Sequence, residues 1–123
     1  MTTRRFKAVV DRQAESTGVG IVEYVEGGET IAIHSLYYDK RLSNRDTYLS
    51  ALKRVEQLTK TDDTAILRTA VMQNKPQWRK DHPNIYGKVE RFKPQAFGEP
   101  LDLARDAILR GSTIHEQLNE MER

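Results

Sequence analysis

Apolar and polar positions in the first third of the chain follow the pattern of consecutive β-strands. Residues 6–11 form an apolar run rich in β-branched side chains, which predicts a strand buried in a sheet. A second strand is expected over residues 18–25. Gly27-Gly28 predicts a tight hairpin, because glycine accepts positive φ without steric cost, and residues 30–38 are then the antiparallel partner.

The apolar period then lengthens to that of a helix, expected from Ser43 to about Lys60. Ser43 is placed as the N-cap, with Asp46 three residues later as in a capping box. Residues 64–69 read as a fourth strand. Since a whole helix precedes it, this strand is expected to run parallel to the first by a crossover connection.

The rest of the chain predicts a fifth strand over residues 85–92 and a helix over residues 101–110 that Gly111 ends. Ser112 or Thr113 is placed to cap a last helix over residues 114–121, so a helical tail is expected over residues 112–123. The pattern therefore predicts an α/β fold with a mixed five-stranded sheet, three strands antiparallel and two parallel, flanked by helices.

Composition narrows the class of protein. A chain of 123 residues with 37% apolar and 31% charged residues predicts one globular domain, residues 1–123, with its core at about residues 5–110. No apolar stretch approaches the roughly 18 residues that cross a bilayer, so no membrane partner is expected. The chain has no cysteine, which excludes disulfides and thiolate metal sites, and a cytoplasmic location is expected.

Basic residues are concentrated in one segment. Residues 68–93 hold seven Lys or Arg against two acids, whereas the whole chain has a net charge of only +2. Such an excess indicates either a phosphate-facing patch or an ordinary solvated surface. Trp78 lies within the segment and either stacks on a base or sugar or fills the core.

Several short segments of the sequence, taken in chain order, resemble segments of the ribonuclease H type 1 family. Val10-Asp11 with Gly18-Val19-Gly20-Ile21-Val22 resembles its first two strands and the turn between them. Residues 42–52 are similar to the asparagine-bearing entry of its first helix, and residues 66–70 to its fourth strand. Residues 98–105, Gly-Glu-Pro-Leu-Asp-Leu-Ala-Arg, resemble the start of its last helix.

The resemblance implies a site for two divalent metal ions, held by four carboxylates, that cleaves the RNA strand of an RNA/DNA hybrid. Matched position by position, the first acid is Asp11 and the last is Asp102, but the second is Thr47 and the third is Ala70. Neither replacement can ligate Mg²⁺ as a carboxylate does. Asp46 lies one helical step from the second position, about 100° around the axis, and no acid lies within three residues of Ala70.

We therefore expect a catalytically impaired member with no required cofactor, in which Asp11 and Asp102 are remnants that bind Mg²⁺ or Mn²⁺ weakly. Each of the two aspartates also has an ordinary structural explanation, Asp11 in a turn and Asp102 in the first turn of a helix. The family's active-site histidine has no counterpart here. His34, His82 and His115 are expected to be structural or exposed.

Nucleic acid is the expected partner. The expected binding residues are basic, polar or aromatic: Asn44, Arg45, Lys75, Trp78, Arg79, Lys80, Arg91 and Lys93. Two further hypotheses stand beside this non-catalytic binding module. One is a divergent metal-dependent ribonuclease H that uses Asp11 and Asp102, and the other is a protein-interaction or inhibitor domain of a phage or mobile element.

Overall fold

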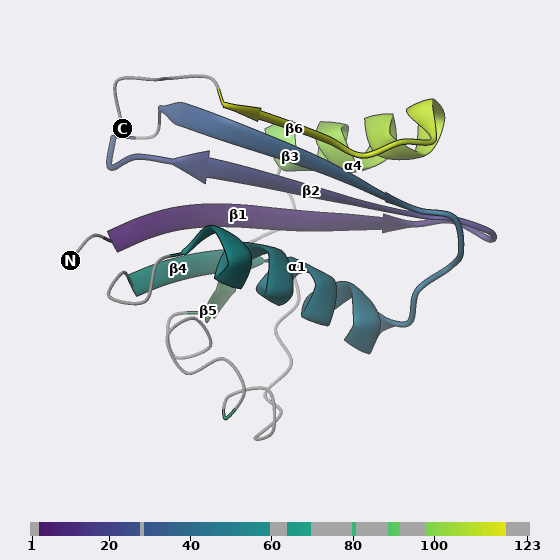
Figure 1. Ribbon diagram of the computed structural model, residues 1–123, viewed down its shortest axis with the longest axis horizontal. Helices are drawn as coiled ribbons and strands as arrows, with labels where there is room; N and C mark the ends of the chain where they lie inside the picture. Colours follow the sequence, from purple (N-terminus) through teal and green to yellow (C-terminus); the bar gives the residue numbers. More distant parts are fainter. Residues whose placement is uncertain are drawn as a thin grey trace.

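The structure is a computed structural model that describes residues 3–27, 29–59, 64–69, 80, 89–91 and 98–117. The described part is a six-stranded sheet with helix α1 on one face and helix α4 on the other (Figure 1). The elements are β1 (Thr3–Arg12), β2 (Thr17–Tyr24), β3 (Thr30–Tyr38), α1 (Asn44–Leu58), β4 (Thr64–Thr69), β5 (Val89–Arg91), α4 (Gly98–Arg110) and β6 (Ile114–Gln117). No helix in these ranges is long and apolar enough to span a bilayer.

The strand order is β5-β4-β1-β2-β3-β6. β1, β2 and β3 are antiparallel neighbours, whereas β4 is parallel to β1 and β5 is parallel to β4. The predicted mixed sheet of three antiparallel and two parallel strands is therefore confirmed. The hairpin between β2 and β3 contains Gly27 at a φ of 104°, the positive value that favours glycine at such a turn.

The predicted C-terminal helix is wrong over its first turn. Residues Ile114–Gln117 form β6, which pairs antiparallel with the outer edge of β3 through residues 32–35. The capping-box spacing of Thr113 and Glu116 is a local signal, and such signals give way when a sheet edge offers backbone hydrogen-bond partners. Residues 118–123 lie outside the described part of the chain.

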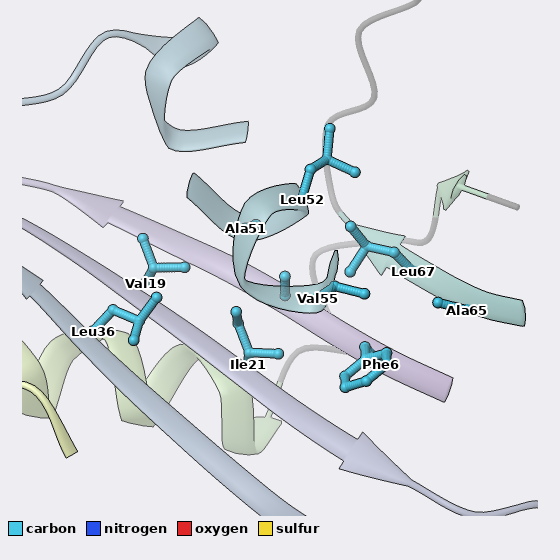
Figure 2. Close-up of a cluster of buried hydrophobic side chains, with 10 residues drawn as sticks. Phe6, Val19, Ile21, Leu36, Ala51, Leu52, Val55, Ala65 and Leu67 are labelled. Carbon is cyan, nitrogen blue, oxygen red and sulfur yellow. The ribbon is translucent and has the colours of Figure 1, made fainter. Parts of the chain in front are cut away.

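The main core lies between α1 and the sheet (Figure 2). Phe6, Val19 and Ile21 are fully buried on the α1 face of β1 and β2. Ala51, Leu52 and Val55 of α1 pack against them, and Leu67 extends the cluster onto β4. Alternate residues of each strand therefore face α1, which leaves the other alternate set facing α4.

The α1 helix begins and ends as its sequence requires. Ser43 is the N-cap, and its hydroxyl accepts a hydrogen bond from the Asp46 backbone N–H at 3.1 Å. At the other end, Nη1 of Arg4 donates to the carbonyl of Leu58. A cation at this end is stabilising, because the last helical carbonyls lack partners within the helix.

Candidate nucleic-acid interface and metal-ligand positions

Asp11 lies near the end of β1 on the α4 face of the sheet. It pairs directly with Gly18, and residues that face each other in an antiparallel pair share a face. The Asp11 carboxylate accepts hydrogen bonds from the Gln13 amide nitrogen at 3.0 and 3.1 Å. Asp11 therefore lies within the strand, is half-buried, and is hydrogen-bonded to Gln13, the first residue after β1.

Thr47 occupies the helix position that the resemblance gives to the second acid. It is 3% exposed and heads the inward stripe of α1, one turn before Ala51 and two turns before Val55. Asp46, one residue earlier, is exposed and lies at the start of the helix. The structure thus places a threonine on the inward face and the neighbouring carboxylate outside it.

Asp102 lies on the outer side of α4. The buried residues of this helix are Pro100, Ala104 and Ala107, whereas Asp102 is exposed. Two residues along a helix correspond to a rotation of about 200°, so Asp102 lies nearly opposite Ala104, which rests on the sheet. The exposure and rotation turn Asp102 away from the sheet face on which Asp11 lies.

The described residues do not fit a two-cation centre. In the ranges given above, no group of three or more His, Cys, Asp or Glu side chains could hold a metal ion. Thr47 supplies no carboxylate, and Ala70, at the third position, lies outside the described residues and has no ligand atom on its side chain. Weak Mg²⁺ or Mn²⁺ binding by Asp11 and Asp102 stays a prediction, and the outward position of Asp102 weighs against it.

The expected binding residues are described only in part. Arg45 is exposed in the first turn of α1, next to Asn44, where the helix begins, and Lys80 is also exposed. Arg91 ends β5, and only its backbone is described. The other four, Lys75, Trp78, Arg79 and Lys93, lie outside the described residues.

The fold brings further basic residues to the start of α1. Nη1 of Arg41 donates to the carbonyls of Arg12 and Gln13, at 3.3 and 3.0 Å. Nη1 of Arg12 donates in turn to the carbonyl of Leu42 at 3.2 Å. These bonds tie the turn after β1 to the loop before α1.

Four basic residues, Arg12, Lys40, Arg41 and Arg45, therefore gather at one end of the molecule, and we call them the α1-entry cluster. Lys40, Arg41 and Arg45 are exposed, and Arg12 is half-buried. Of these four residues, the sequence alone indicates only Arg45. Arg12 and Arg41 are far apart along the chain and carry no local motif, so only the register of β1, β2 and β3 shows that they meet.

Comparison with solved structures finds neighbours among type 1 ribonucleases H. LC11-RNase H1, isolated from compost by a metagenomic approach, has a TM-score of 0.65 at 14% identity, over 90% of this chain and 99% of that chain. Its structure in complex with an RNA/DNA hybrid has a TM-score of 0.64 at 14% identity, over 88% of this chain and 98% of that chain. RNase H1 from the halophilic archaeon Halobacterium salinarum has a TM-score of 0.59 at 15% identity, over 88% of this chain and 98% of that chain. No family model and no curated protein matches the sequence.

Proposed function

We propose that this chain, which has a ribonuclease H-like fold, is a non-catalytic module that binds an RNA/DNA hybrid or a duplex. Its basic surface would consist of the α1-entry cluster together with the tryptophan-bearing segment around Trp78. The observation that carries the proposal is the combination of this fold with loss of the acid at Thr47, whose inward position is retained.

The α1-entry cluster has the properties of a phosphate-contacting surface. Three of its four side chains are exposed, so their charged groups can contact a ligand without any rearrangement of the core. Asp11, Glu15, Asp39 and Asp46 lie in the same strand end, turn and loop, so the cluster supplies cations at defined positions rather than a net positive charge. Several cations on one side of a fold bind a polyanion mainly by releasing its counterions, which makes the affinity dependent on salt.

Cleavage is not expected, because the carboxylates that would bind two cations are incomplete. Thr47 and Ala70 replace two of the four acids, and Asp102 points away from the sheet. In-line phosphoryl displacement by two metal ions needs both ions close together and partly neutralised by acids. Asp11 alone, hydrogen-bonded to Gln13, cannot provide this.

The first test measures binding by fluorescence anisotropy with hybrid, duplex DNA, duplex RNA and single-stranded probes over a range of salt concentrations. Arg45→Glu is expected to weaken hybrid binding by about tenfold at low salt, because it removes one phosphate contact and adds a repulsive charge. Lys53→Glu is the matched control, since Lys53 is exposed on the same helix but outside the cluster. Its effect is expected to be within about twofold.

A second pair of variants addresses the segment around Trp78. Trp78→Ala is expected to weaken binding by about tenfold with an unchanged salt slope, because stacking does not release counterions. The double change Arg79→Gln and Lys80→Gln is expected to make the affinity fall less steeply as the salt concentration rises, because two phosphate-contacting cations are removed. Absence of salt-dependent binding to every probe would overturn the proposal, and nuclease-insensitive recovery of a stoichiometric protein partner would then favour an interaction domain.

A further inference from the structure

Two histidines meet where β6 joins β3. His34 of β3 and His115 of β6 are directly paired in the antiparallel register, and their Nδ1 atoms are 2.8 Å apart. The ring centroids lie 5.0 Å apart, at an interplanar angle of 58°. His34 is 5% exposed, whereas His115 is exposed.

The neighbouring arginine fixes which nitrogen carries the shared proton. Nη2 of Arg54, from α1, lies 3.4 Å from Nδ1 of His115, and a guanidinium can only donate. Nδ1 of His115 must therefore be the acceptor. A hydrogen bond between two Nδ1 atoms needs one proton, so His34 donates from Nδ1 and its Nε2 is left as an unprotonated nitrogen.

This arrangement cannot take up a further proton without leaving it unpaired or losing a hydrogen bond. Nε2 of His34 is buried without a hydrogen-bond partner in the described part of the molecule, so a proton added there would be unpaired. A proton added to Nδ1 of His115 would remove the acceptor that both His34 and Arg54 use. Either event places a new positive charge beside Arg54.

Two further charged groups of the described sheet, Arg4 and Glu23, lie on this face and do not relieve that charge. Arg4 of β1 is a second cation near His34, and Glu23 of β2 is already engaged by Arg4 in two hydrogen bonds of 2.7 Å. Burial, then Arg54, His115 and Arg4, lower the pKa of His34 from 6.5 to about 4. Burial and Arg54 also lower the pKa of His115.

We propose that β6 is a pH-sensitive strap, held on the edge of β3 by the His34–His115 hydrogen bond and released when the pair takes up a proton. The strap begins after Gly111, whose φ of 71° turns the chain out of α4. This turn stays anchored, because Arg110 donates to Ser35 and Ser112, and Thr113 accepts from the Tyr37 backbone N–H. Release would therefore be confined to the strand, and it would uncover the backbone groups of β3.

The direction of the effect follows from the two protonation states. When β6 detaches, His115 leaves its neighbours and its pKa returns to about 6.5, whereas burial and Arg54 lower the pKa of the docked His115, so the detached form binds more protons just below pH 6.5. The strap is fully held above pH 6.5 and weakens as the pH falls below this value. For one proton taken up, the detached fraction rises about tenfold per pH unit in this window.

The test is amide hydrogen exchange of β6 and of the β3 edge at pH 7.5 and 5.5, corrected for the intrinsic exchange rate. Opening of β6 is expected to rise about tenfold at the lower pH, while the amides shared by β1 and β2 stay protected. His115→Gln keeps an acceptor that takes up no proton and is expected to abolish the increase. His82→Gln removes the remaining histidine and is expected to keep it.

Equal corrected exchange of β6 at the two pH values, or an increase that persists in His115→Gln, would overturn the proposal. Nitrogen chemical shifts of the imidazoles give a second readout that does not depend on a variant. At pH 7.5 His34 is expected to carry its proton on Nδ1 and His115 on Nε2. Protons on Nε2 of both rings would also overturn it, since no hydrogen bond would then join the two Nδ1 atoms.

Discussion

Arg4 and Glu23 form an ion pair under the C-terminal end of α1. Nε and Nη2 of Arg4 each donate to one carboxylate oxygen of Glu23 at 2.7 Å, and the Glu23 side chain is only 7% exposed. Arg4 also donates to the carbonyl of Leu58 and lies over the Phe6 ring at 5.5 Å. One guanidinium thus joins β1, β2 and α1.

Glu23→Gln is expected to lower the free energy of unfolding by about 2–4 kcal/mol, because it leaves a largely buried guanidinium without its counter-charge. Glu26→Gln is the control, since its ion pair with Arg5 spans 3.8 Å and Glu26 is 88% exposed. That change is expected to cost less than about 0.5 kcal/mol. Urea unfolding at pH 7 measures both variants, and equal costs would show that the Arg4–Glu23 pair contributes no more than a surface pair.

The contact between α4 and β2 depends on two glycines. A Cβ atom on Gly18 would lie 1.9 Å from the carbonyl oxygen of Ala104, and one on Gly20 would lie 1.9 Å from that of Pro100. Both obstacles are backbone atoms, which no side-chain rotation can move. Ser35 supports the same contact from β3 by donating to the carbonyl of Leu103 at 2.6 Å.

Gly20→Ala is therefore expected to destabilise the protein by about 3 kcal/mol or more, since α4 must move off the sheet. Gly27→Ala is the matched change, because Gly27 has open space around it and a φ of 104°, so only backbone strain of about 1 kcal/mol is added. Thermal unfolding of the two variants distinguishes these cases. Similar shifts in melting temperature would mean that α4 does not lie as close to β2 as the structure places it.

Elements with strong local signals were predicted well. β3 and β4 have the predicted bounds, and α1 begins after the predicted cap, because β-branched runs and a capping serine act over a few residues. α4 begins at Gly98, earlier than predicted, since Pro100 is tolerated in a first helical turn. β6 was missed because its partner, β3, lies far away in the sequence.

The candidate interface was predicted less completely than the fold. Asn44 and Arg45 follow from the helix start, but Arg12 and Arg41 meet only through the arrangement of three strands. The outward position of Asp102 likewise depends on which side of α4 rests on β2, and the close approach at Gly18 and Gly20 determines that side. Neither the meeting of Arg12 with Arg41 nor the outward position of Asp102 can be derived from spacing along the sequence.

The α1-entry cluster and the paired histidines lie in different parts of the molecule. The turn after β1 and the start of α1 lie together at one end of the sheet, on the right of Figure 1, and carry the α1-entry cluster. The paired histidines lie on the β6 edge of the sheet, away from the β4 and β5 edge. Binding of nucleic acid and release of the strap can therefore be measured independently.

The proposed module binds an RNA/DNA hybrid without cutting it. The most direct measurement incubates a labelled RNA/DNA hybrid with the protein in Mg²⁺ and in Mn²⁺ and follows bound and cleaved fractions in the same samples. We expect salt-dependent binding of an intact hybrid, with no change in the cleaved fraction for Asp11→Asn. Cleavage by the unmodified protein that disappears in Asp11→Asn would contradict it.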